Sequence, residues 1–156
     1  MNKLTKIFGI TLILLTVTVA GLFAQKGSVR LGLEFGNPTA VIIIRPGNFD
    51  FKIGYDLRES GNLFLSADYR VISGYQLVDF LHLFLGVGAY TQIFFDGVSP
   101  LEFGARIPIG LQVFLLNSVL ELFAEVAPTV GLVPTITAFP QWQGFVGFTI
   151  RVPRFW

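Results

Sequence analysis

Few side chains in this chain of 156 residues have types and spacings that support catalysis. His82 is the single histidine, and Ser66 and Asp68 lie with it on the polar side of an alternating pattern, so a Ser-His-Asp arrangement is conceivable. Their spacing gives that arrangement no support, and a hydrogen-bonding role inside the fold explains His82 better. We therefore expect no catalytic residues and no enzyme activity.

Glu121 and Glu125 are the nearest approach to a carboxylate pair. Four residues apart on one side of a strand, their carboxylates would lie about 13 Å apart, which is too far for paired acid–base chemistry. Arg106 or Arg151 is therefore the expected partner of these glutamates. The chain has no Cys, no metal-ligand spacing of His, Asp or Glu, and no glycine motif for phosphate or dinucleotide. We accordingly expect no metal and no cofactor.

The composition indicates a folded, unusually apolar chain with a single domain. Hydrophobic residues make up 53% of it. Charged residues make up only 13%, against roughly 25% in ordinary soluble domains. This excludes intrinsic disorder, and the net charge of +1 gives no reason to expect a nucleic-acid partner.

Residues 1–24 have the pattern of a secretory signal peptide. Two early lysines precede an uncharged apolar run over residues 7–20, and small residues then allow cleavage after Ala20 or Ala24. The apolar run is short for a membrane-spanning helix. We expect the secretion translocon to engage this segment and residues 25–156 to form one β-barrel domain.

Apolar and polar residues alternate along seven segments, with the period of two that is typical of strands. The segments are Val29–Phe35, Phe49–Arg58, Leu63–Val71, Leu81–Gln92, Leu101–Val113, Leu120–Ala127 and Gln143–Val152. An eighth strand is expected at Thr39–Arg45, which is apolar on both sides, so its facing stays open. Turn residues such as Ser73-Gly74 separate the segments, and the longest connection is expected at about Pro128–Gln141.

Charged residues gather on the polar side of these strands. Of the nineteen charges in residues 25–156, thirteen lie there, and the other six, Arg45 among them, fall at turns or strand ends. The thirteen are Arg30, Glu34, Asp50, Lys52, Asp56, Arg58, Asp68, Arg70, Glu102, Arg106, Glu121, Glu125 and Arg151. Such alternation fits either a soluble barrel with its apolar side inward or a membrane barrel with that side toward lipid.

Three features favour the membrane solution. Arg or Lys facing lipid at mid-depth costs ~2–4 kcal/mol, which explains the absence of charge from the apolar side. The thirteen charges comprise seven acids and six bases, a balance that suits an enclosed lumen where charges must pair. Glycines also gather on the polar side, as the narrow interior of an eight-stranded barrel requires. We expect a network of charges in a lumen that side chains fill.

Residues 144–156 resemble the final strand of a bacterial outer-membrane barrel. Phe148, Ile150 and Val152 alternate ahead of a terminal aromatic residue, Trp156. The machinery that inserts such barrels recognises an ending of this kind. The resemblance therefore implies that these four residues form an assembly signal for the barrel-assembly machinery.

Three short blocks, Gly36–Thr39, Arg106–Leu111 and Glu121–Pro128, resemble a family of small, poorly characterised outer-membrane β-barrel proteins. The resemblance implies an eight-stranded, OmpA/OmpX-like barrel of the bacterial outer membrane with both termini in the periplasm. It implies no known substrate.

Together these observations predict an all-β fold, an eight-stranded antiparallel up-and-down transmembrane barrel that follows a cleaved signal peptide. We expect a monomer in contact with outer-membrane lipid, with a structural or surface-interaction role. Two alternatives stay open. One is a small channel or apolar-solute carrier of the same shape, and the other is a soluble periplasmic lipocalin-like barrel that binds an apolar ligand.

Overall fold

A computed structural model gives the fold of most of the chain. It describes residues 28–36, 40–55, 61–95, 101–134, 136 and 141–152. The predicted signal peptide (residues 1–24), Asp56, Arg58 and Trp156 lie outside the described residues. No helix in the described ranges is long and apolar enough to cross a membrane.

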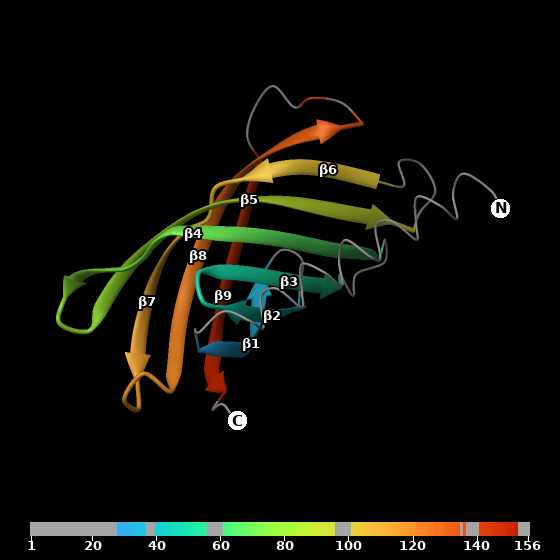
Figure 1. The fold of residues 1–156 in the computed structure, drawn as a ribbon. Helices are drawn as coiled ribbons and strands as arrows, with labels where there is room; N and C mark the ends of the chain where they lie inside the picture. Colours follow the sequence, from blue (N-terminus) through green and yellow to red (C-terminus); the bar gives the residue numbers. More distant parts are fainter. Residues whose placement is uncertain are drawn as a thin grey trace.

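The described chain folds into antiparallel β-strands (Figure 1). In chain order they are β1 (Val29–Gly36), β2 (Ala40–Pro46), β3 (Phe49–Tyr55), β4 (Asn62–Val78), β5 (Leu81–Phe94), β6 (Leu101–Arg106), β7 (Ile109–Leu115), β8 (Leu120–Val133) and β9 (Gln141–Val152). The prediction of an all-β antiparallel fold is therefore confirmed.

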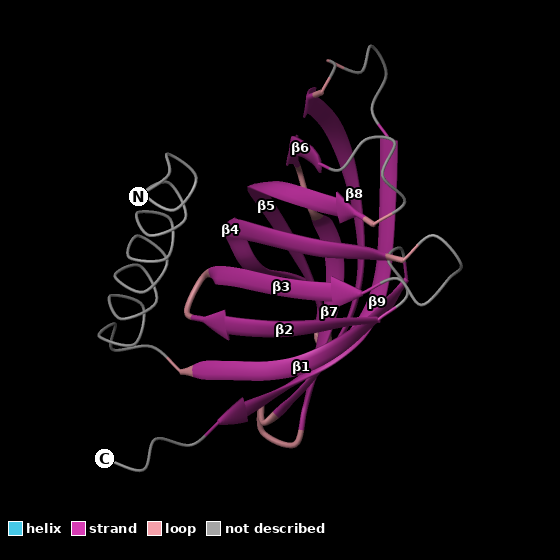
Figure 2. Ribbon diagram, turned by 90° about the vertical axis from the view of Figure 1, so that its right-hand side faces the viewer, coloured by secondary structure: helices cyan, strands magenta, loops and turns pink. Residues whose placement is uncertain are grey.

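The strands close into a ring with eight strand positions. Each strand from β1 to β5 pairs with the next, β8 pairs with β9, and β9 pairs back with β1. Strands β6 and β7 share the remaining position, because each of them pairs with both β5 and β8. The ring is strongly twisted. Strands β3 to β6 cross the direction of β8 and β9 at a large angle (Figures 1 and 2).

The segment Leu101–Val113, predicted as one strand, is broken between β6 and β7 at Ile107 and Pro108. Proline has no amide hydrogen to donate to a strand ladder. Its carbonyl still accepts a hydrogen bond from the Gly86 amide at 2.8 Å, and the Ile107 amide donates to the Pro128 carbonyl at 3.1 Å. The break thus bends the chain without shifting which side chains face the interior.

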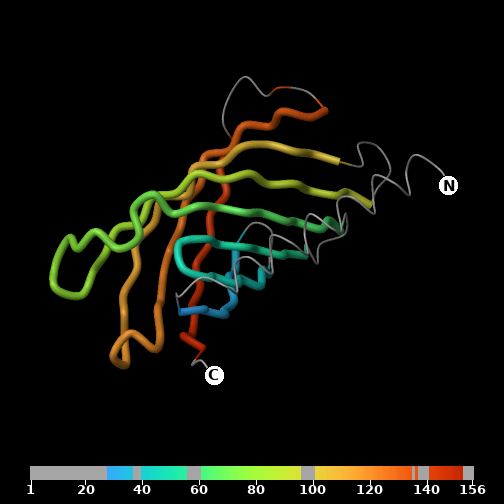
Figure 3. The backbone as a smooth tube through the Cα atoms, viewed as in Figure 1, coloured from blue at the N-terminus to red at the C-terminus, as the bar shows by residue number. Residues whose placement is uncertain are grey.

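One end of the ring, called here the short-turn end, holds the tight connections. It consists of the turns at Gly47-Asn48, Asp79-Phe80 and residues 116–119, together with the start of β1 and the end of β9. At this end β4 and β5 continue past the last residue of β4 that pairs with β3, Tyr69, and form a projecting hairpin (Figure 3).

The long hairpin corrects two predictions of connections. Ser73-Gly74 is not a turn but lies within β4, where irregular pairing with β5 accommodates the extra residues and Gly74 has a φ of 107°. Only glycine adopts that backbone region readily. The predicted connection Pro128–Gln141 is also too long, because β8 continues to Val133 and pairs with β6.

The facing of the predicted strand Thr39–Arg45, which the sequence left open, is settled by β2. Val41, Ile43 and Arg45 are buried inside the ring, whereas Ile42 is 55% exposed on the outside. The inner face of β2 therefore ends in an arginine.

Candidate functional site

The two faces of the ring have opposite chemistry. Charged side chains on the inner face are almost fully enclosed, with exposures of 0–7%. Large apolar side chains on the outer face are open, such as Val146 at 58%, Val126 at 52% and Ile53 at 51%. Water-soluble proteins do the opposite: they bury large apolar side chains and expose charged ones.

The structure places nine of the thirteen predicted network residues inside the ring. They are Arg30, Glu34, Asp50, Lys52, Asp68, Arg70, Arg106, Glu121 and Glu125. Glu102 is half-buried and accepts a hydrogen bond from the Tyr90 hydroxyl at 2.5 Å. Arg151 is exposed, contrary to the prediction, because β9 there reaches the rim of the ring beyond its last residue paired with β8.

The inner cluster, as we name it, consists of Glu34, Lys52, Asp68, Arg106 and Glu125. The Lys52 ammonium lies 2.8 Å from a Glu125 carboxylate oxygen and 3.2 Å from one of Glu34. The Arg106 guanidinium pairs with Glu125 and also lies 3.2 Å from Asp68. Burial makes each pairing obligatory, because an unpaired buried charge is far more costly than a paired one.

The end cluster consists of Arg30, Arg45, Asp50, Arg70 and Glu121, closer to the short-turn end. Arg45 pairs with Asp50 and donates to both Glu121 carboxylate oxygens, at 2.5 and 2.6 Å. The Arg70 Nε donates to Asp50 at 2.9 Å. Arg30 donates to the Ser118 carbonyl at 2.6 Å, which ties β1 to the turn between β7 and β8.

Aromatic side chains fill the interior around these charges. Phe123 lies between Glu121 and Glu125 on the inner side of β8, and its ring contacts that of Phe84 with the centroids 6.4 Å apart. Phe64, Tyr90 and Phe145 form a second group with Val41. The Arg70 guanidinium lies 3.9 Å from the Phe84 ring centroid, a favourable cation–π arrangement.

Inward-facing glycines make the room that these rings occupy. A Cβ atom at Gly110 would overlap the Phe84 ring and the Ala124 carbonyl. One at Gly104 would overlap Tyr90 and the Val130 carbonyl. These inward-facing glycines therefore leave the space that the aromatic rings need in a narrow interior, as the sequence pattern predicts.

The sequence missed several inward-facing polar residues. The sequence predicts Arg45 at a turn, because its strand carries no other charge and shows no alternation. Gln112 and Gln143 accept hydrogen bonds from Arg70 and Arg106 at 2.7 and 3.0 Å, and Thr149 donates to Glu121 at 2.9 Å. Their position on the polar side of the alternation is the signal that points to them, although they carry no charge.

The structure does not assemble the conceivable Ser-His-Asp arrangement. Asp68 pairs with Gly88 across β4 and β5, and His82 lies six residues further along β5, about 20 Å away. The His82 ring packs edge-on against Phe114, with ring centroids 5.2 Å apart, and its Nδ1 has no hydrogen-bond partner in the ranges that the structure describes. The hydrogen-bonding role expected for His82 is thus not seen at that atom.

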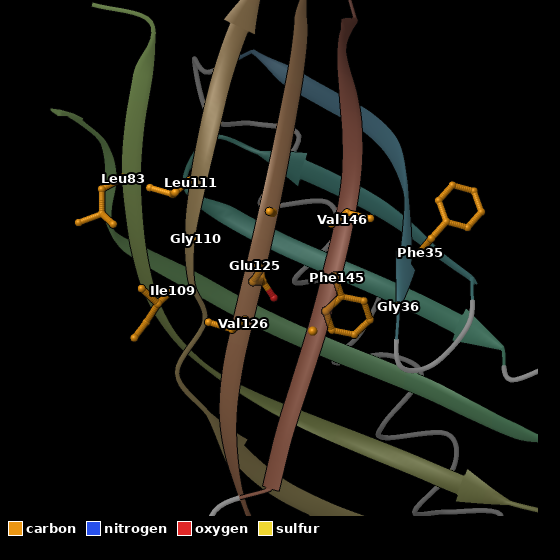
Figure 4. A pocket seen from close by; sticks show the side chains of 12 residues that line it. Phe35, Gly36, Leu83, Ile109, Gly110, Leu111, Glu125, Val126, Phe145 and Val146 are labelled. Atoms are coloured by element: carbon orange, nitrogen blue, oxygen red, sulfur yellow. The ribbon is translucent and has the colours of Figure 1, made fainter. Parts of the chain in front are cut away.

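The outer face carries a shallow apolar hollow of about 590 Å³ over β7, β8, β9 and neighbouring strands (Figure 4). Its lining includes Ile109, Val126 and Val146 and the small residues Ala124 and Gly144. On the same face of β9, Ile150 is 47% exposed, while Phe148 and Val152 are half-buried. These three residues of the predicted assembly signal therefore share the outer face.

A second hollow, of about 330 Å³, opens at the short-turn end and is polar. Four members of the end cluster line it, Arg30, Arg45, Arg70 and Glu121, together with the rim residue Arg151. Comparisons with protein-family models, with curated proteins and with solved structures returned no match for this chain.

Proposed function

We propose that this chain is an integral protein of the bacterial outer membrane, a monomeric β-barrel whose lumen is filled by side chains. Its role is structural or in surface interaction rather than catalytic. The observation that carries the proposal is the inverted burial, with charges enclosed in the ring and bulky apolar side chains on its exterior. Lipid is the solvent that favours such an exterior.

The exterior argues against a soluble ligand-binding barrel. Exposed apolar patches on soluble monomers rarely exceed a few hundred Å². Here open apolar side chains recur on every strand of the ring, among them Leu33 on β1, Ile53 on β3 and Leu111 on β7. The interior is equally unsuited to an apolar ligand, because buried ion pairs and their hydrogen-bonding partners occupy it.

The filled interior also argues against an open channel. Eight strands leave an interior just wide enough for side chains to fill. In this ring Phe84 and Phe123 pack between the levels of the two charge clusters, and Phe64, Tyr90 and Phe145 pack beside the inner cluster. We expect planar bilayers containing the protein to show no steady conductance.

The biogenesis partners follow from the same proposal. The secretion translocon would export the chain by residues 1–24, and the barrel-assembly machinery would recognise the ending that contains Phe148, Ile150, Val152 and Trp156. Outer-membrane lipid is the permanent partner.

Fractionation of a bacterium that expresses the full chain tests the proposal. We expect the protein in washed outer membranes, released only by detergent, and migrating faster on a detergent gel when unheated than when boiled. Recovery of a folded monomer from detergent-free buffer would contradict the proposal. In the Gly104→Leu variant a bulky side chain would overlap Tyr90 and prevent the ring from closing. This variant should lose the heat-sensitive migration, which would show that the gel shift depends on the folded ring.

A further inference from the structure

The polar hollow at the short-turn end contains more positive than negative charge. Four guanidinium groups line it, those of Arg30, Arg45, Arg70 and Arg151. Within the described part of the chain, two carboxylates neutralise them, Glu121 in the lining and Asp50 behind it, bound to Arg45 and Arg70. The excess is two positive charges around the hollow.

Three of these arginines lie side by side across neighbouring strands. Arg30 on β1 is the direct register partner of Arg45 on β2 and of Arg151 on β9. Like charges directly opposite each other on a sheet are destabilising. A bound anion would remove that repulsion.

Two of the arginines that line the hollow each have one guanidinium nitrogen without a hydrogen-bond partner in the described part of the chain. They are the Arg30 Nη1 and the Arg70 Nη2, whose side chains are 8% and 3% exposed, and neither atom has a partner among the described residues. The other nitrogens of both side chains are held in place by Ser118, Asp50 and Gln112. Buried donors of this kind normally have a partner, because leaving a buried donor without a hydrogen bond is costly.

We propose that this hollow binds a phosphate group carrying two negative charges, as inorganic phosphate or as a phosphomonoester. Guanidinium groups recognise the tetrahedral oxygens of phosphate through paired N–H donors. The volume of about 330 Å³ lies at the small end of ligand sites, which fits a compact anion. The site depends on the geometry of the ring end and does not require that the exterior contact lipid.

Titration calorimetry of the folded chain in a nonionic, phosphorus-free detergent tests this site with inorganic phosphate. We expect saturable binding of one phosphate per chain, with sodium chloride at matched ionic strength giving no such signal. Arg30→Gln should weaken binding by about tenfold or more, because it removes a buried donor to a charged ligand. Arg151→Gln should weaken it by about two- to fivefold, as expected for an exposed charge.

The Arg151→Gln variant guards against a folding artefact, since Arg151 makes no ion pair within the described residues and its loss should leave the ring intact. Gln92→Asn, on β5 and outside the hollow, is the control that should bind phosphate as the parent does. Absence of saturable binding in the parent, or equal affinity in the parent and both arginine variants, would overturn the proposal.

Competition distinguishes the source of the phosphate group. Glycerol 3-phosphate displacing inorganic phosphate while short-chain phosphatidate in the same micelles does not indicates a soluble phosphomonoester. Displacement by phosphatidate at lower concentration indicates a lipid headgroup that reaches the ring end. Either result supports a phosphomonoester as the ligand, and displacement by neither identifies inorganic phosphate itself as the ligand.

Discussion

The inner and end clusters contain the same number of ionised side chains, but they differ in enclosure and balance. The inner cluster has three carboxylates and two cations, all at most 2% exposed, and ion pairs link its members across the ring. The end cluster has three arginines and two carboxylates, and it borders a hollow open to the ring end. The comparison indicates that enclosed charges serve the fold, whereas charges in excess at an opening can serve a ligand.

The packing between the clusters keeps them separate. Phe123 follows Glu121 and precedes Glu125 on the inner side of β8, and Arg45 lies 5.3 Å from its ring centroid. Lys52 and Arg106 instead lie 5.2 and 5.7 Å from the Phe145 ring. Each cluster therefore has its own aromatic support, which allows its contribution to be tested alone.

The largest effect is expected in the inner cluster. Arg106→Ala removes a partner of Glu125 and Asp68 and leaves Lys52 facing three buried carboxylates. We expect a loss of about 3–5 kcal/mol in the free energy of unfolding, the usual cost of breaking a buried pair. Urea titration of the refolded chain in lipid vesicles, followed by loss of the heat-sensitive gel shift, measures it. A change below about 1 kcal/mol would show that the cluster does not stabilise the ring.

A smaller effect is expected from crowding the aromatic layer between the clusters. Gly110→Ala places a methyl group against the Phe84 ring and the Ala124 carbonyl. We expect destabilisation of about 1–3 kcal/mol in the same titration, as for other overpacked interiors. Gly144→Ala is the matched control, because a Cβ there lies 4.0 Å from its nearest neighbour, the Glu125 carbonyl. Equal effects at the two glycines would mean that the interior is not tightly packed.

The smallest effect on stability is expected at the exposed rim of the short-turn end. Arg151→Ala removes an exposed guanidinium without an ion pair in the described part of the chain, so the free energy of unfolding should change by no more than about 0.5 kcal/mol. The same urea titration measures it. A loss comparable to that of Arg106→Ala would show that the exposed rim stabilises the ring as much as the inner cluster does.

The sequence predicts the strands of the ring well because alternation is a local signal. It keeps its phase through the break at Pro108, so Ile107 and Ile109 are both exposed as predicted. It fails where the partner strand decides the outcome. Arg45 belongs to a strand without alternation, and only its pairing with β1 and β3 fixes its direction.

The arrangement of arginines at the short-turn end is the part of the ring that is least predictable from the sequence. The register that aligns Arg30 with Arg45 and Arg151 depends on where three separate strands end. The hollow beside them depends in addition on the turn between β7 and β8, whose Leu116, Asn117 and Ser118 all have positive φ angles. Neither property is encoded in any single segment of the sequence.

The central claim is that the apolar exterior contacts lipid, and fluorescence quenching at one outward position tests it most directly. Leu111 is 41% exposed on β7, beside the apolar hollow. In a chain with Trp142→Phe, Trp156→Phe and Leu111→Trp, refolded into vesicles, the single tryptophan should be quenched by lipids brominated on their acyl chains and shielded from aqueous acrylamide. Strong quenching by acrylamide, with none from brominated lipid, would contradict the claim.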